Sequence, residues 1–520
     1  MNWKAFRRKC IRWENTTLKI LGQVEMLFAL VLLIPAAFAL SFGEDVRPFL
    51  ILTAPLFLIG FAQYMTCTES RTFRSVNGLL LVAMTWIIMF GICMVPYLLS
   101  GFKPIDALVE SVSGITTTGL TVIGDLDLQP TSLLIWRSLT QWIGGITVVL
   151  IFLYFLPMVG YGRDLFHNEL AGSGSSQYSQ RASNAAKSFI FVYLLLSAFN
   201  FILLLVCGVS PLESMCLMLT TISTGGLTIV NSSLSTYSDA VQWITILFMF
   251  LGGTNFYLHY RAIYIREKGV YRGNSEFRIM VAWFIAISLV ICLFMYQAAN
   301  VNGIALDSQS IYQTFKNAIF TTVSLGTSTG FYVDDFTLWP SQCMILLMIV
   351  AMIGASTSST SGGIKFSRIR IIYEYVKNGF RGTMHSNAVY TIKIDRKSVD
   401  DSIVRGALVV FMMYIATMIV AAVGFMAFGY NMVDSFGLSI SAISNGGMGF
   451  GNFGPTGDFG SMDGGIKLFM VLLMWIGRLE VVTALILFTP GFWKDVWLNS
   501  RARHKAKHAL DRYGLESQKR

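Results

Sequence analysis

Charged residues are scarce in this chain, and their scarcity excludes most soluble folds. Asp, Glu, Lys and Arg together make up 13% of the 520 residues, while hydrophobic residues make up 54%. Soluble domains carry roughly 25% charged residues. A soluble protein of this size could not bury so much apolar surface, so the composition indicates a membrane protein.

Cysteine and histidine are also few, and their spacing argues against two kinds of site. The seven cysteines form no CxxC pair, and the five histidines are dispersed. Neither a disulfide framework nor a zinc site is indicated. The apolar runs also lack the His, Asp, Glu and Cys constellation that a membrane transferase or protease needs. We therefore expect no enzyme and no cofactor in this chain.

Long apolar runs are abundant, and they indicate how the chain is organised. About ten runs mostly reach the roughly 20 residues that a membrane-spanning helix needs. They lie at residues 21–42, 48–66, 76–100, 132–158, 187–208, 239–258, 279–298, 341–355, 406–428 and 466–489. No stretch between them is long enough for a separate globular domain. The sequence therefore predicts an all-α polytopic membrane protein in a lipid bilayer.

The formal net charge of +10 follows this predicted topology. Of the 39 Lys and Arg residues, 33 lie in segments that recur on alternate sides of the runs. These segments are 1–20, 67–75, 159–187, 261–278, 365–405 and 491–520. Because cytoplasmic loops of membrane proteins are enriched in Lys and Arg, we expect both termini in the cytoplasm. Topology explains the charge, and we expect no nucleic-acid partner.

Four short polar segments that contain glycine recur between apolar runs. Aligned on one glycine each, they are separated by 106, 105 and 116 residues. The aligned segments are Thr117-Thr118-Gly119, Ser223-Thr224-Gly225, Ser328-Thr329-Gly330 and Ser444-Asn445-Gly446. The residue two before the glycine is hydroxylated in all four. Recurrence at near-constant spacing indicates an internal repeat.

The flanks of these segments repeat as well. Each segment follows an apolar run too short to span a membrane and precedes a long helix that contains glycine. The short runs are Pro104–Ile115, Pro211–Ile222, Ser310–Ser324 and Met432–Ile443. We predict a fourfold pseudo-symmetric repeat of span, pore half-helix, filter loop and span, preceded by two extra N-terminal helices. The predicted units are 1–75 (arm and extra helices), 76–160, 187–264, 276–378 and 403–490 (pore repeats) and 491–520 (basic cytoplasmic tail).

Irregular backbone inside a bilayer is tolerated only where protein buries it or where it lines a water-filled path. Four loops that meet on one axis fulfil this condition, since their carbonyl oxygens can replace the hydration shell of an alkali cation. Glycine permits the backbone angles that turn those carbonyls inward. Close helix packing through small residues is the alternative explanation for a single segment. Four segments in register favour a K⁺ selectivity filter, with K⁺ as the transported ion.

With these loops the chain resembles the TrkH branch of the TrkH/KtrB/HKT potassium transporter superfamily. Two further motifs carry the resemblance, Ser358 to Lys365 (SSTSGGIK) and Ile476 to Glu480 (IGRLE). In plant relatives a serine at the first filter glycine accompanies sodium transport, so Gly119 implies potassium. The fourth loop departs from the pattern, because Asn445 stands where the other three loops, in this alignment, carry threonine.

The resemblance also implies a gate. In relatives, a stretch of small residues in the third post-filter helix is an intramembrane loop that obstructs the pore. The corresponding residues here are Gly354, Ser356, Thr357, Ser358, Ser359, Thr360, Ser361, Gly362 and Gly363, followed by Lys365. Arg478 is the one basic residue well inside a predicted post-filter span. It either faces the pore as an electrostatic barrier or pairs with Glu480 or the nearby loop.

These expectations together describe potassium uptake across a bacterial inner membrane, driven by the membrane potential. The resemblance implies a homodimer on a separate cytoplasmic ring of TrkA type that binds NAD or ATP. The basic segments 365–405 and 491–520 could serve as docking surfaces, or could reflect topology and lipid headgroup contact. An ion-coupled K⁺/H⁺ or K⁺/Na⁺ symporter is the alternative within transport. A membrane enzyme is the alternative of another class.

Overall fold

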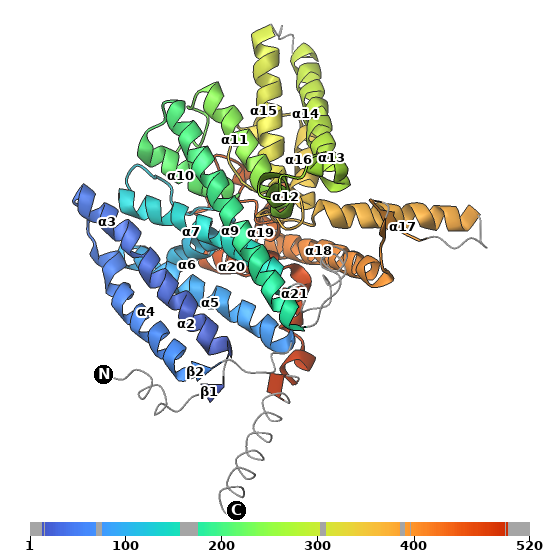
Figure 1. Ribbon diagram of the computed structural model, residues 1–520. Coiled ribbons are helices and arrows are strands. Elements are labelled where there is room, and N and C mark those ends of the chain that lie inside the picture. The colour runs from blue at the N-terminus through green and yellow to red at the C-terminus, as the bar shows by residue number, and fades with distance from the viewer. Residues whose placement is uncertain are drawn as a thin grey trace, which may run out of the picture.

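The structure of the protein is a computed structural model that describes residues 13–14, 16–68, 75–155, 175–301, 308–384, 391–395, 397–494 and 496–497. These residues are mostly helical (Figure 1), which confirms the predicted all-α class. The few strands are two residues long and pair as β1 with β2 and as β3 with β4.

A helical hairpin precedes the first predicted repeat. Its elements are β1 (Trp13–Glu14), α2 (Thr16–Val31), α3 (Leu33–Phe42), α4 (Arg47–Thr66) and β2 (Cys67–Thr68). Helices α2 and α4 pack closely where two glycines face each other, because a Cβ on either Gly22 or Gly60 would overlap the other residue's carbonyl oxygen. The hairpin forms one edge of the molecule in Figure 1.

Three helix types then recur in order along the chain: a long helix, a short helix that ends in a polar loop, and the helix that follows this loop, which we call the post-filter helix. The first two sets are α5 (Ser75–Leu99), α6 (Pro104–Ile115) and α7 (Thr131–Phe155), then α9 (Ser175–Val206), α10 (Pro211–Ile222), α11 (Asp239–Gly252), α12 (Phe256–Ile263) and α13 (Val270–Gly273). The third set is α14 (Ser275–Val301), α15 (Ser308–Gly326), η1 (Phe336–Leu338), α16 (Ser341–Ile353) and α17 (Phe366–Met384), followed by β3 (Lys393–Ile394) and β4 (Lys397–Ser398). The fourth is α18 (Asp401–Ala427), α19 (Met432–Ile443), η2 (Gly451–Phe453), α20 (Gly464–Arg478) and α21 (Val481–Ile486).

The short helices α6, α10 and α19 have the bounds that the sequence predicts. Proline at the first helical position fixes the start of α6 at Pro104 and of α10 at Pro211, because its missing N–H has no helical partner at that place. Helix α15 is longer than the predicted Ser310–Ser324 and runs from Ser308 to Gly326.

Each short helix packs against the post-filter helix of the set before it. The contacting pairs are α10 with α7, α15 with α11, α19 with α16 and α6 with α20. The last pair joins the fourth set to the first, so the four sets close into a ring. This closure brings the loops that follow the short helices to the centre of the molecule.

Not every predicted span passes a test of length and apolar composition. Among the residues that the structure describes, six helices are long and apolar enough to cross a membrane, and the bent pair α11 and α12 would make seven. Three predicted spans do not pass this test: α7 is not among these helices, α16 ends after 13 residues and α20 ends after 15. Helices α16 and α20 are each continued by a second helix after a break, and α11 meets α12 at 100°.

The outer surface of the long helices is apolar. Leu58 on α4 is 65% exposed and Val420 on α18 is 70% exposed. Large exposed apolar surface on a helical protein is typical of contact with lipid. The structure thus agrees with a multi-pass membrane protein.

Candidate functional site

The four loops that follow the short helices share one backbone conformation. The first residue after each helix donates its hydroxyl to the carbonyl four residues earlier; these residues are Thr116, Ser223, Thr327 and Ser444. The next residue has positive φ, and these residues are Thr117 (53°), Thr224 (52°), Ser328 (53°) and Asn445 (52°). Two residues further on a glycine has positive φ, at Gly119 (84°), Gly226 (74°), Gly330 (88°) and Gly447 (72°). Positive φ is uncommon outside glycine, so its recurrence at one position of all four loops shows a single repeated structure.

This shared conformation corrects the alignment of the second and fourth loops. The sequence alignment set Gly225 and Gly446 against Gly119 and Gly330, but the equivalent glycines are Gly226 and Gly447. The alignment was wrong by one residue because both loops contain two adjacent glycines, and either fits the pattern. In the corrected register Asn445 is equivalent to Thr117, Thr224 and Ser328, and the position three before the glycine is the one that is always hydroxylated.

The four loops form a closed ring with their backbones in contact. A Cβ built on each glycine would lie under 3.0 Å from a carbonyl oxygen of the next loop. The pairs are Gly119 with Gly225, Gly226 with Thr329, Gly330 with Gly446 and Gly447 with Thr118. Every partner is the residue before the equivalent glycine in the neighbouring loop. Only glycine can occupy these positions without displacing the next loop.

The ring has the chemistry of a cation site. Within each loop the φ angle is positive at two residues and negative at the residue between them. The N–H groups of successive loop residues, such as Ser328 and Thr329, donate to carbonyls of the short helix, so the carbonyl oxygens of the same peptide groups point away from that helix. Rings of backbone carbonyls can replace the water around an alkali cation.

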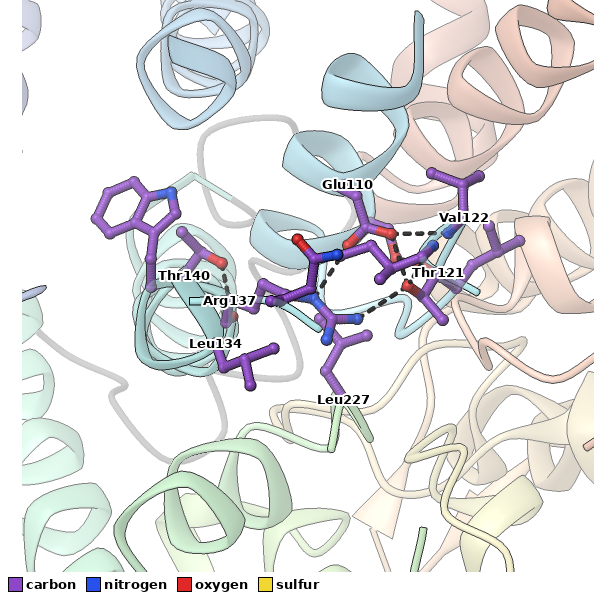
Figure 2. A network of polar contacts seen from close by, with 12 residues as sticks. Glu110, Thr121, Val122, Leu134, Arg137, Thr140 and Leu227 are labelled. Atoms are coloured by element: carbon purple, nitrogen blue, oxygen red, sulfur yellow. Dashed lines mark hydrogen bonds and ion pairs between the residues drawn. The ribbon is translucent and has the colours of Figure 1, made fainter. Parts of the chain in front are cut away.

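A buried ion pair supports the first loop (Figure 2). Glu110 on α6 and Arg137 on α7 are 0% and 1% exposed, and Arg137 Nε lies 3.1 Å from Glu110 Oε2. Glu110 Oε1 accepts hydrogen bonds from the Thr121 hydroxyl (2.6 Å) and the Val122 N–H (2.7 Å). Arg137 Nη2 donates to the same Thr121 hydroxyl at 2.9 Å. The pair therefore holds the chain two and three residues after Gly119.

Sequence reasoning did not single out this ion pair. A glutamate and an arginine inside otherwise apolar helices were the available signal, because an ionisable residue at membrane depth needs a partner. Arg137 also donates to the carbonyl of Thr228 at 3.3 Å, which connects α7 to the second loop.

The fourth loop is joined to the first through Asn445. Its Nδ2 donates to the Thr118 hydroxyl at 2.9 Å and to the Met474 carbonyl at 3.0 Å. A threonine could not make both of these donations, because a hydroxyl carries one hydrogen. The asparagine that departs from the sequence pattern therefore ties two loops and α20 together.

The predicted interruption of the third post-filter helix is present. Helix α16 ends at Ile353 and α17 begins at Phe366. Gly354, Ser358, Gly363 and Lys365 have positive φ, so the segment between the helices is irregular. The predicted gate residues all lie in this segment except Arg478, which is the last residue of α20.

The irregular segment lies against three of the four loops. Thr224 donates its hydroxyl to that of Thr360 at 3.0 Å, and the Gly362 N–H donates to the Ser328 hydroxyl at 2.7 Å. A Cβ on Gly362 would overlap the carbonyl oxygen of Ser444. These partners belong to the second, third and fourth loops. The segment is thus packed directly against the ring.

Arg478 contacts the irregular segment and does not pair with Glu480. Its Nη1 donates to the Thr360 carbonyl at 3.0 Å, and the residue is 6% exposed. Glu480 instead pairs with Arg368 on α17 at 2.7 Å. Lys365 is 3% exposed and donates through Nζ to the Ser361 carbonyl. The contact of Arg478 with the nearby loop is thus observed, and its role as an electrostatic barrier stays a prediction.

A further carboxylate holds the same segment from helix α14. Glu276 accepts hydrogen bonds from the Thr357 N–H at 2.9 Å and from the Thr357 hydroxyl at 3.2 Å.

In the described part of the chain, no group of three or more His, Cys, Asp or Glu residues is placed to hold a metal ion.

Comparison with known proteins agrees with this geometry. The family model described as TrkH, cation transport protein, matches residues 48–494. The Trk system potassium uptake protein TrkH of Halomonas elongata is 30% identical over 491 residues, which cover 92% of this chain and 98% of that protein. TrkH of Escherichia coli K12 is 29% identical over 485 residues, which cover 92% and 99%. The crystal structure of the potassium transporter TrkH from Vibrio parahaemolyticus superposes with a TM-score of 0.82 at 28% identity, and covers 92% of this chain and 98% of that one. With a family match over most of its length, the chain belongs to the TrkH family of cation transport proteins.

Proposed function

We propose that this protein takes up potassium through a K⁺-selective pore driven by the membrane potential. The ring of four equivalent loops carries the proposal, because it combines carbonyl oxygens, a shared register and glycines that admit no side chain. The relatives named as Trk system potassium uptake proteins support K⁺ as the ion. Inward movement of one charge gains about 2.3 kcal/mol per 100 mV of membrane potential, so no chemical step is needed.

The filter in this proposal consists of the predicted residues in corrected register. It includes Gly226 and Gly447, which join the predicted glycines Gly225 and Gly446 in the second and fourth loops. In this proposal the protein lies in a bacterial inner membrane, and the distribution of Lys and Arg supports a cytoplasmic location of both termini.

The segment between Ile353 and Phe366 is the gate in this proposal. Its contacts with three loops support that role, since a segment packed against the ring can block an ion that leaves it. Arg478 and Lys365 stabilise the closed position through carbonyls of Thr360 and Ser361. A cytoplasmic nucleotide-binding ring of TrkA type would act on α17, which projects away from the bundle in Figure 1. The active form would be a homodimer.

An ion-coupled symporter is the second candidate, and one observation favours it. Glu276 places a carboxylate against the gate segment, where a coupled mechanism would need a titratable group. The pore and the symporter differ in what moves with K⁺: coupled transport carries H⁺ or Na⁺ in a fixed ratio, and a pore does not.

Ion flux into liposomes that contain the purified protein tests both candidates. For a K⁺-selective pore, tracer K⁺ uptake follows an imposed membrane potential, Na⁺ does not replace K⁺, and a pH-sensitive dye inside the liposomes reports no accompanying acidification. Na⁺ flux that replaces K⁺ flux, in no fixed ratio to it, would overturn the filter. Uptake of H⁺ or Na⁺ in fixed proportion to K⁺, abolished by Glu276→Gln, would favour the symporter.

A further inference from the structure

The second loop lacks a side chain that the first and third loops use to brace themselves. In those two loops the residue before the glycine is Thr118 or Thr329. Each of these hydroxyls lies 2.7 Å from the hydroxyl two residues earlier, on Thr116 or Thr327. The equivalent residue of the second loop is Gly225, which has no side chain to make this contact.

Gln141 occupies the space that Gly225 leaves open. A Cβ built on Gly225 would lie 2.7 Å from Gln141 Nε2 and still closer to other atoms of the same amide. Gln141 is on α7 and is 0% exposed. The glycine in the loop and the glutamine on the helix are therefore complementary, since a side chain on Gly225 would displace the amide.

Both ends of the Gln141 amide bind the second loop. Nε2 donates to the Gly225 carbonyl at 2.7 Å, and Oε1 accepts from the Leu227 N–H at 3.1 Å. The two bonds are on either side of Gly226, the equivalent of Gly119. They fix the direction of the peptide groups that flank this glycine.

The Gly225 carbonyl is also the one against which Gly119 packs. Its position is thus shared by the first and second loops, and a change there is transmitted around the ring. Glycine has more accessible backbone conformations than any other residue. Without Gln141, the Gly225–Gly226 pair could rotate its peptide groups away from the arrangement that the other loops share.

We propose that Gln141 is a positioning residue that sets the ion selectivity of the filter by holding the second loop in register. This inference rests on the proposed function, because it presumes that the ring is the filter. Gln141 acts through the Gly225 and Leu227 peptide groups and does not coordinate the ion itself. The amide supplies from α7 the brace that threonine supplies within the first and third loops.

Three variants test the inference in liposomes by the reversal potential in mixed K⁺ and Na⁺. Gln141→Leu keeps the size of the side chain and removes both hydrogen bonds. We expect its K⁺ over Na⁺ permeability ratio to fall at least about fivefold, the factor that one hydrogen bond is worth, because two bonds are removed. Gln242→Leu is the matched control: Gln242 is buried on α11 and donates to the Leu234 and Tyr237 carbonyls, outside the ring. Its permeability ratio should stay at the wild-type value.

Gln141→Glu decides the case if the leucine variant does not fold. An ionised carboxylate can accept from Leu227 but cannot donate to the Gly225 carbonyl, whereas a protonated carboxyl group can do both. Selectivity of Gln141→Glu should therefore recover as the pH falls and be lost as it rises, and the wild-type ratio should show no such change.

Three results would overturn the inference: an unchanged permeability ratio in Gln141→Leu, an equal loss in Gln242→Leu, or a ratio in Gln141→Glu that does not respond to pH. A loss of thermal stability with intact selectivity would likewise make Gln141 a structural residue only. If the wild-type protein itself does not prefer K⁺, the proposed function fails, and the two failures are thereby distinguished.

Discussion

The residues behind the ring are as constrained as those that form it. Glu110 and Arg137 are fully enclosed, and together they hold the Thr121 hydroxyl and the Val122 N–H. A buried ion pair need not stabilise a protein more than apolar side chains would, but removing one partner leaves an uncompensated charge. The free energy of unfolding should therefore fall most in variants that remove one partner and leave the other one buried.

Arg137→Met should destabilise the protein strongly, by about 3–5 kcal/mol, because it leaves Glu110 buried without its partner. The double variant Glu110→Gln with Arg137→Met should recover part of this loss, since no charge remains. Thermal unfolding in detergent measures the stability of the wild type, the single variant and the double variant. A double variant no more stable than Arg137→Met alone would contradict the coupling.

Gly119 is the residue at which a Cβ would have the clearest effect on the ring. Gly119→Ser should relax selectivity toward Na⁺, because the added Cβ would meet the Gly225 carbonyl and the φ of Gly119 is +84°. The protein should remain folded. The reversal potential in mixed K⁺ and Na⁺ measures the change. Gly124→Ser is the control, since nothing lies within 4 Å of a Cβ there. Unchanged selectivity at Gly119 would count against the filter.

At the scale of elements, the interruption between α16 and α17 has two sets of partners. It is packed against the ring, and it also donates hydrogen bonds to carbonyls at the end of α11. The Ser356 N–H donates to the Gly253 carbonyl (3.0 Å), and the Thr360 N–H donates to the Gly252 carbonyl (3.3 Å). Arg368 near the start of α17 pairs with Glu480, where α20 gives way to α21. A pull on α17 would thus act on the segment and on the fourth post-filter helix together.

Deleting several residues between Ser356 and Gly363 should give a pore that conducts without activation. The deletion removes the contacts with Thr224 and Ser328 but leaves the ring itself intact. Single-channel recording without any cytoplasmic partner should show a higher open probability than wild type, with K⁺ selectivity retained. A folded channel that stays shut would leave the segment with a packing role only.

At the scale of the whole molecule, the N-terminal hairpin is attached at the edge of the ring of repeats. Glu44, between α3 and α4, accepts hydrogen bonds from the Thr131 and Ser132 N–H groups at the start of α7. Within the hairpin, α2 meets α4 at Gly22 and Gly60. None of these contacts involves a residue of the four loops.

Gly60→Leu should therefore lower stability without changing selectivity. Its side chain would overlap the backbone of α2, and overpacking of this kind costs about 1–3 kcal/mol. Unfolding temperature and K⁺ over Na⁺ permeability, measured on the same preparation, separate the two effects. Gly91→Leu on α5 is the control, because a Cβ there meets nothing within 4 Å. A loss of selectivity in Gly60→Leu would show that the hairpin contributes to the pore.

The sequence by itself determined the class of the protein and most of its helices. Low charge and long apolar runs require a membrane fold, and proline at the start of α6 and α10 sets their bounds locally, without help from the rest of the chain. Recurrence of hydroxyl and glycine located all four loops. The interruption after Ile353 was likewise readable, because ten small residues do not continue an apolar helix.

Only the tertiary structure decided the register of the loops and the residues that hold them. With two adjacent glycines in the second and fourth loops, the sequence cannot say which one takes positive φ. The structure shows positive φ at Gly226 and Gly447, the two that pack against a carbonyl of the neighbouring loop. Gln141 and the Glu110–Arg137 pair were not found for the same reason. Their role depends on contacts between helices and loops that lie far apart in the sequence, and the ring closes only when all four repeats are folded together.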